Sequence, residues 1–170
     1  MADLGTLLGY EATRPKYGAA TDCRWRGVFG NHLEVITFEA KIEHGSAAVI
    51  DPHAVGQAHN QRNRAIQELG TRGYSVRGTI VSHIEQVEAS AASSVGEIKL
   101  IRKAAILALW HRVSGLLSTY RDDWSANDVG ARLNAAAALI PRIARTGWLD
   151  RALVQTDIVV DEVVLLSEWP

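Results

Sequence analysis

Two carboxylates and an ammonium group fall on neighbouring segments that are both expected to be extended. Glu39 and Lys41 are two positions apart in a run of alternating apolar and polar residues, so a β-strand would place both on one face. Asp22 begins a shorter strand-like run, and Gly30-Asn31 between the runs favours a tight turn. If the runs pair as a hairpin, these three side chains can converge. Carboxylates bind hard divalent cations, and an ammonium group can stabilise developing negative charge.

The longer of the two runs, residues 32–44, is expected to form one strand. Its apolar and polar side chains alternate, with Ile36, Phe38, Ala40 and Ile42 on one face and Thr37, Glu39, Lys41 and Glu43 on the other. The same alternation in the shorter run, residues 22–26, turns Cys23 away from Asp22 and into the core. An alternative interpretation is an exposed edge strand on which Glu39 and Lys41 are ordinary surface charges.

The spacing Asp22 … Glu39-Ala40-Lys41 resembles the signature of the PD-(D/E)XK nuclease superfamily, the restriction-endonuclease-like and resolvase-like phosphodiesterases. That signature is an acidic residue, a variable gap, and then Glu/Asp-X-Lys on the next strand. The leading Pro of the motif's name is missing, since Thr21 precedes Asp22. The resemblance covers residues 9–84 and implies an αβββαβ core, an α/β fold with a mixed central sheet flanked by helices.

A helix beginning at Asp51-Pro52 and running to Leu69 follows this strand, because Asp can cap a helix and Pro suits its first position. In many members of the superfamily such a helix carries a Gln that reaches the active site, and Gln57, with Gln61 one turn later, fits that arrangement. A solvated polar face is the alternative for both. The expected apolar side of the helix consists of Ala58, Ala65, Ile66 and Leu69.

The resemblance implies hydrolysis of phosphodiester bonds with Mg²⁺ or Mn²⁺ as cofactor and nucleic acid as substrate, DNA rather than RNA. Asp22 and Glu39 would be metal ligands, and the backbone carbonyl of Ala40 a third. Lys41 would orient the nucleophile, favour its ionised form or stabilise developing negative charge. Gln57 would position water or substrate through hydrogen bonds.

Three further residues are candidate accessories to this site. Some resolvase-like members place an extra metal-binding acid on the first helix, and Glu11 falls roughly there, although a solvated surface glutamate is the alternative. Gln61 accompanies Gln57. His83, near the end of the next expected strand at residues 75–84, could point into a cleft or serve as a hydrogen-bonded structural histidine.

Length and composition set the broad class. A chain of 170 residues with 47% hydrophobic and 22% charged residues is expected to form one domain with an adequate core. No apolar run approaches the roughly 18 residues that span a bilayer, and no signal-peptide pattern is evident. One cysteine excludes an internal disulfide and regularly spaced cysteine zinc sites. We therefore expect a cytoplasmic protein without membrane association.

The formal net charge of −1 bears on partners, since phosphate neutralisation supplies much of the affinity for nucleic acid. We expect a partner domain or subunit to deliver the substrate, so that this domain either was cut from a longer protein or serves a partner. The candidate nucleic-acid contacts are local groups of cations, namely Arg24, Arg26, Arg62, Arg64, Lys99, Arg102 and Lys103.

The second half of the chain is expected to be a helical extension at residues 94–154 and a strand-like tail at 155–168. Ser94 to Glu97 matches a capping box that would open the longest helix, and the segment Ser125-Ala-Asn-Asp128 would cap the next one. The hydrophobic tail could pack on another domain or form a homodimer. Two further functions therefore stay open: a nuclease-like DNA-binding or docking module that no longer cuts, and an α/β oligomerisation domain.

Overall fold

The computed structural model describes residues 1–15, 21–29, 32–41, 49–69, 73–84, 86–96, 98–126, 128–143 and 156–157. The predicted turn at Gly30-Asn31, the end of the long strand after Lys41, residues 144–154 of the expected helical extension and all of the predicted tail except 156–157 lie outside these residues.

Helices and strands follow one another as α1 (Ala2–Leu7), β1 (Glu11–Thr13), β2 (Cys23–Phe29), β3 (His32–Lys41), α2 (Pro52–Leu69), β4 (Ser75–Ser82), the 3₁₀ turn η1 (Ala89–Ala91), α3 (Ala92–Val95), β5 (Ile98–Arg102), α4 (Lys103–Ala126), α5 (Val129–Ile143) and β6 (Thr156–Asp157). The strands form one sheet in the order β1-β2-β3-β4-β5-β6. β1, β2 and β3 form an antiparallel meander, β4 and β5 run parallel to β3, and the two-residue β6 pairs antiparallel with β5. The chain is therefore an α/β protein with a mixed central sheet, and its first six elements have the order αβββαβ.

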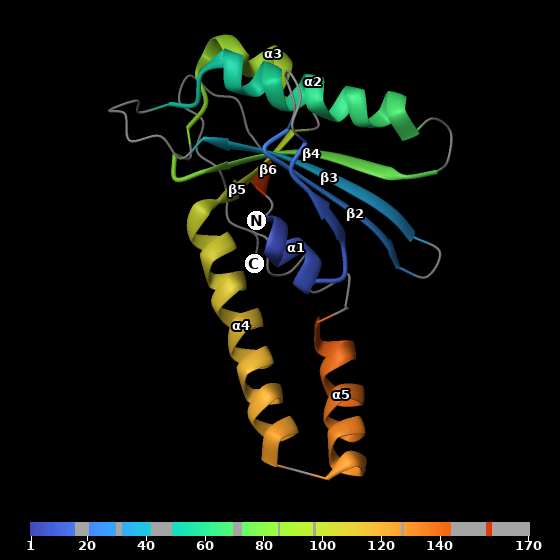
Figure 1. The fold of residues 1–170 in the computed structure, drawn as a ribbon. Coiled ribbons are helices and arrows are strands. Elements are labelled where there is room, and N and C mark those ends of the chain that lie inside the picture. Colours follow the sequence, from blue (N-terminus) through green and yellow to red (C-terminus); the bar gives the residue numbers. More distant parts are fainter. Residues whose placement is uncertain are drawn as a thin grey trace.

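Helices cover both faces of the sheet (Figure 1). α2 and α3 lie on one face, α1 and α4 lie on the other, and α5 runs beside α4. The face under α1 is filled by aromatic side chains, with the ring centroids of Trp25 and Phe38 4.6 Å apart. The face under α2 is filled by smaller aliphatic residues such as Val55, Ile80 and Leu100. β4 and β5 therefore contribute side chains to both layers of the core, for example Val81 to the layer under α1 and Ile80 to the layer under α2.

β3 is a buried interior strand of the sheet. It pairs with β2 on one side and β4 on the other, and Val35, Ile36, Thr37 and Phe38 are each at most 2% exposed. β-branched and aromatic residues suit such a strand because they pack well on a pleated surface. The alternative of an exposed edge strand is therefore wrong.

α2 begins and packs as its sequence dictates. The carboxylate of Asp51 accepts a hydrogen bond of 2.8 Å from the backbone N–H of Ala54, as predicted for an N-cap. The helix comes close to β4 because Gly78 has no side chain: a Cβ there would lie 2.5 Å from Cδ1 of Ile98 and 3.3 Å from the carbonyl of Ala58. Small residues thus bring α2 against the strands that carry the candidate site.

Two strands were not predicted where they occur. Residues 10–15 are mostly polar and predict irregular structure, but Glu11–Thr13 form β1 through backbone pairing with β2. The longest helix was expected to open at Ser94, but Ile98–Arg102 form β5 and α4 begins only at Lys103. β5 pairs in parallel with β4, and its residues Ile98 and Leu100 are buried against α2 and α3. The extension from 94 onwards is thus not wholly helical.

Three smaller expectations also differ. Ile66 is 37% exposed and Leu69 is only partly buried, so the buried side of α2 lies elsewhere. It consists of Ala54, Val55, Ala58, Gln61 and Ala65. The small residues at 89–94, which predict a loop, form η1 and α3, and α5 continues through Pro141, although proline is expected to kink or interrupt a helix. Within the segment 125–128 that was expected to cap the next helix, Asp128 is the residue that caps α5, with Oδ1 accepting from the N–H of Ala131 at 2.9 Å.

Candidate functional site

Asp22 lies just before β2 and is held beside the end of β3. Its Oδ2 accepts a hydrogen bond of 2.7 Å from the backbone N–H of Ala40. The register pairs Cys23 with Phe38, so Asp22 is the next position on the side of the sheet that faces α2. Because the N–H and C=O of a strand residue point to the same neighbour, the Ala40 carbonyl is directed to the Asp22 side as well.

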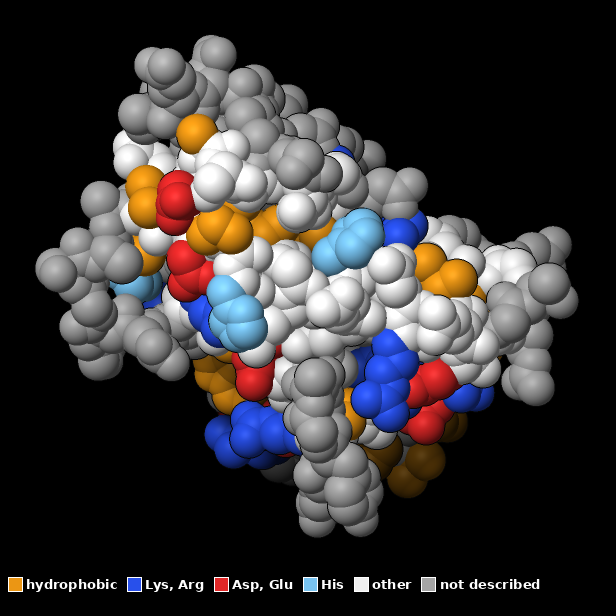
Figure 2. Space-filling model, turned by 90° about the horizontal axis from the view of Figure 1, so that it is seen from above, with side chains coloured by type: hydrophobic (Ala, Val, Ile, Leu, Met, Phe, Trp, Pro, Cys, Tyr) orange, Lys and Arg blue, Asp and Glu red, His pale blue; other side chains and the backbone are white. Residues whose placement is uncertain are grey.

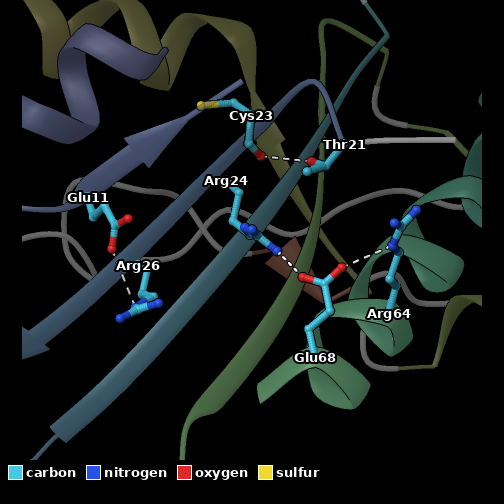
Figure 3. Close-up of polar contacts among 7 residues, drawn as sticks. All are labelled: Glu11, Thr21, Cys23, Arg24, Arg26, Arg64 and Glu68. Atoms are coloured by element: carbon cyan, nitrogen blue, oxygen red, sulfur yellow. Dashed lines mark hydrogen bonds and ion pairs between the residues drawn. The ribbon is translucent and has the colours of Figure 1, made fainter. Parts of the chain in front are cut away.

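Thr21 fixes this junction, and its role was not predicted. Its hydroxyl accepts from the N–H of Phe38 at 3.0 Å and lies 2.7 Å from the carbonyl oxygens of Phe38 and Cys23, to which it can donate. Thr21 is buried, and the side-chain contact to β2 is drawn in Figure 3. A threonine hydroxyl therefore takes the place of a ladder hydrogen bond and locks the residue before Asp22 onto β3.

Glu39 is a buried carboxylate on the α2 side of β3. The residue is 6% exposed, and each carboxylate oxygen has a partner. Oε1 lies 3.0 Å from Nζ of Lys41, and Oε2 accepts a hydrogen bond of 2.6 Å from Nε2 of Gln61. A buried carboxylate requires such partners because desolvation disfavours its charge.

Lys41 connects this carboxylate to α2. Its Nζ donates to Oε1 of Gln57 at 2.9 Å while also pairing with Glu39, and its side chain is 29% exposed. Glu39 and Lys41 share a face because they are two positions apart on a strand. Gln57 and Gln61 share a face of α2 because they are one turn apart. The sheet and the helix therefore bring four polar side chains into one cluster.

We call Asp22, Glu39, Lys41, Gln57 and Gln61 the strand-end cluster. All four residues predicted to be catalytic belong to it, and the accessory candidate Gln61 is a direct partner of Glu39. Its chemistry is two carboxylates, one ammonium and two amides at the carboxyl end of β3. Within the described residues, three or more His, Cys, Asp and Glu side chains nowhere gather in a metal-binding arrangement.

Gln61 carries the second feature that sequence reasoning missed. The prediction placed it on a polar row of α2, but the residue is 7% exposed. Its Oε1 is buried and has no hydrogen-bond partner among the described protein atoms. A buried acceptor without a partner is uncommon in native structures. An oxygen of the strand-end cluster is thus available to a bound water, cation or substrate.

The other two accessory candidates lie apart from this arrangement. Glu11 is on β1, in register with Arg26, and its Oε2 lies 3.5 Å from Nε of that residue. Arg26 pairs with Val35, five strand residues or roughly 16 Å from Ala40. The structure therefore does not bring Glu11 to the site. His83 directly follows β4 and is exposed.

Several of the predicted nucleic-acid-binding cations are paired with acids. Arg24 and Arg64 both contact Glu68, and Arg26 contacts Glu11 (Figure 3). Seen from the side of α2 and α3, basic side chains form separate groups, several with acidic side chains beside them (Figure 2). The other predicted cations are Arg62, whose Nε donates to the Val76 carbonyl at 3.3 Å, Lys99 and Arg102 on β5, and Lys103 at the start of α4.

Among the residues that the structure describes, two titratable groups have pKa values displaced by their surroundings. The hydrogen bond from Arg24, and secondarily that from Arg64, lowers the pKa of Glu68 below its ordinary value. Burial raises the pKa of the Cys23 thiol, which lies in the core opposite Asp22 as predicted. The Cys23 thiol is therefore protonated at neutral pH and is part of the packing beneath the site.

Comparison with protein-family models, with curated proteins and with solved structures finds no match for this chain. Among the helices in the described part of the chain, none combines the length and apolar character needed to cross a membrane.

Proposed function

We propose that this protein is a metal-dependent nuclease that hydrolyses phosphodiester bonds in nucleic acid, with DNA as the expected substrate. The observation that carries the proposal is the strand-end cluster, in which Glu39, Lys41 and Gln57 are joined by contacts of 3.0 and 2.9 Å. The carboxylate of Asp22 accepts a hydrogen bond from the backbone N–H of Ala40, the residue between Glu39 and Lys41. The αβββαβ order and the resemblance of the sequence motif to the PD-(D/E)XK superfamily support the same proposal.

The donor set suits Mg²⁺ or Mn²⁺. Both are hard cations that take oxygen ligands, and Mg²⁺ is commonly held by one or two carboxylates with further positions left for water and phosphate. Asp22 and Glu39 would supply the carboxylates, the Ala40 carbonyl is directed to the same place, and Oε1 of Gln61 is a buried oxygen without a partner. The cation would supply charge neutralisation on the phosphate and activation of water.

The protein's own side chains supply positioning and charge. Lys41 is held by Glu39 and Gln57, so its ammonium group has a fixed place from which to stabilise negative charge on the phosphate. Gln57 has an amide N–H₂ for orienting a water molecule or substrate while its oxygen holds Lys41. Gln61 holds the Glu39 carboxylate in one orientation. Preorganised groups of this kind act without reorganising when charge develops.

The direct test is cleavage of labelled single-stranded DNA, double-stranded DNA and RNA by the full chain, with Mg²⁺ or with EDTA. We expect cleavage only with the cation. Lys41→Met should lower the rate about 100-fold or more, the scale seen when one preorganised charge-stabilising donor is removed. Asp122→Asn, an exposed acid near the end of α4, is the matched control and should cleave like the wild type.

Cleavage that is unaffected by Lys41→Met would reject the catalytic assignment. Absence of cleavage on every substrate with both cations, for a protein that is folded by circular dichroism, would favour a nuclease-like binding module instead. The proposal includes a partner domain or subunit that delivers substrate, because the net charge of −1 limits affinity for phosphates. It also includes a cytoplasmic setting, where a lone cysteine stays reduced.

A second candidate function is assembly, favoured by apolar side chains exposed on the helical pair α4–α5. Val129 is 69% and Leu133 63% exposed on α5, and Leu107 is 47% exposed on α4. Val129 and Leu133 are one turn apart and share a face of α5, and contiguous exposed apolar surface is typical of interaction sites. Light scattering of the full chain and of Leu133→Lys tests it: a homodimer that dissociates with the substitution supports this function, and a monomeric wild type rejects it.

A further inference from the structure

A cluster of two arginines around one glutamate lies on the same side of the sheet as the strand-end cluster. Nη1 of Arg24 on β2 lies 2.6 Å from Oε2 of Glu68, and Nε of Arg64 on α2 lies 3.0 Å from Oε1 of the same carboxylate. Figure 3 shows the two guanidinium groups converging on Glu68 from β2 and from α2. We call these three residues the Arg24–Glu68–Arg64 cluster.

The position of this cluster follows from strand and helix periodicity. Arg24 pairs in register with Thr37, which is two strand residues or roughly 7 Å before Glu39. Glu68 follows Gln61 by two turns of α2, roughly 10 Å. One strand of nucleic acid advances about 3.4 Å per charged phosphate, so a strand held at Glu39 would reach the cluster within a few nucleotides.

The charges of the cluster do not balance, and they are open to solvent. Two guanidinium groups face one carboxylate, and the side chains of Arg24, Glu68 and Arg64 are 34%, 43% and 61% exposed. Exposed ion pairs stabilise a fold by only about 0–1 kcal/mol, so stability alone explains little of the arrangement. Paired guanidinium groups fit the tetrahedral oxygens of a phosphate as well as they fit a carboxylate.

We propose that Arg24 and Arg64 form a binding site for a backbone phosphate of the substrate strand, and that Glu68 occupies this site until the strand displaces it. This proposal rests on the proposed nuclease function. It adds a contact to the substrate strand at a phosphate other than the one that is cleaved. Glu68 then acts as an internal competitor, which weakens binding of nucleic acid that is not delivered to the site. Because Glu68 neutralises part of the charge of Arg24 and Arg64 in the free protein, a phosphate site is compatible with a net charge of −1.

The test measures binding of a fluorescent single-stranded oligonucleotide to the full chain by anisotropy, in EDTA to prevent hydrolysis, across a range of salt concentrations. Glu68→Gln should tighten binding about fivefold at 0.1 M salt and steepen the salt dependence, since one more phosphate is neutralised. Arg24→Gln and Arg64→Gln should each weaken binding by up to about fivefold and make the salt dependence shallower. Arg64 is the more exposed, so its variant remains informative if Arg24→Gln lowers stability.

Matched controls separate this site from a general effect of charge. Asp122→Asn removes an acid and Arg121→Gln removes a cation near the end of α4, and both should leave affinity within twofold of the wild type. If Glu68→Gln binds no more tightly than Asp122→Asn, the phosphate site is rejected and the cluster is a structural ion pair.

Binding and cleavage report on the two proposals separately. Cluster variants that shift affinity in a protein that cleaves nothing with Mg²⁺ would overturn the nuclease function and support the phosphate site. Cleavage that depends on Lys41, with affinity unchanged in all three cluster variants, would support the nuclease function and overturn the phosphate site.

Discussion

β3 carries two buried glutamates, and they differ in what surrounds them. Glu34 faces the α1 side, where its Oε2 accepts from the Tyr10 hydroxyl at 2.8 Å and its Oε1 lies 3.2 Å from Nε of Arg77. Glu39 faces the α2 side, with Lys41 and Gln61 as partners. The two residues are 4% and 6% exposed, so burial does not distinguish them.

The difference lies in the neighbouring charges. Glu34 has an arginine and a phenol, which neutralise and satisfy it. Glu39 has a lysine that is shared with Gln57, and a second carboxylate, that of Asp22, at the adjoining peptide N–H. Two such carboxylates can bind a divalent cation together, whereas the charge of Glu34 is already matched by Arg77. We therefore interpret Glu34 as structural and Glu39 as functional.

The largest effect on stability is expected at Glu34. Glu34→Ala removes a buried partner of Arg77 and of Tyr10, and should lower the free energy of unfolding by about 3 kcal/mol. Glu39→Gln keeps a polar group beside Gln61 and removes one of two neighbouring negative charges, so its loss should be about 1 kcal/mol or less. Urea unfolding of the two variants gives the comparison. Equal losses, or a larger loss at Glu39, would contradict the assignment of Glu34 as the structural residue.

A smaller loss is expected at Thr21, which holds the start of β2 against β3. Thr21→Val removes the hydroxyl that satisfies the N–H and C=O of Phe38, at a cost of about 2 kcal/mol. Cleavage should fall as well, because Asp22 is no longer fixed beside Ala40. Thr21→Ser retains the hydroxyl and should recover both properties. Wild-type activity in the valine variant would show that Asp22 does not depend on this contact.

The smallest effect is expected from the pH dependence of Glu68. Its pKa is lowered in the folded protein, so its stabilisation is present above the ordinary value of 4.5 and is lost as the pH falls through the folded-state pKa. Because the cluster is exposed, the contribution should be below about 1 kcal/mol. The difference in unfolding free energy between the wild type and Glu68→Gln should therefore shrink below pH 4.5. A difference that grows on acidification would contradict the ion pairs.

Much of the fold could be predicted where local pattern and tertiary packing agree. The alternation along β3 and the Asp51-Pro52 start of α2 fixed two elements, and both are confirmed. β1 was missed because three residues paired through their backbone leave no hydrophobic pattern. β5 was read as helix because apolar residues from Ile98 onwards fit a helical period, and α4 does begin directly after it.

The candidate site was predictable in its members but not in its contacts. Strand spacing indicated that Glu39 and Lys41 share a face, and the resemblance to the PD-(D/E)XK superfamily implied that Gln57 could reach them. Nothing in the helical period showed that Gln61 would be buried on Glu39, because that depends on how α2 is rotated over the sheet. The bridging role of Thr21 depends on the register of β2 against β3, which the sequence does not specify.

The central claim is that Glu39, and not the equally buried Glu34, serves catalysis. The most direct measurement is the rate of DNA cleavage with Mg²⁺ by Glu39→Gln and Glu34→Gln side by side, both shown to be folded. We predict a loss of about 100-fold or more for Glu39→Gln and a rate within a few-fold of the wild type for Glu34→Gln. Equal rates in the two variants would contradict the account.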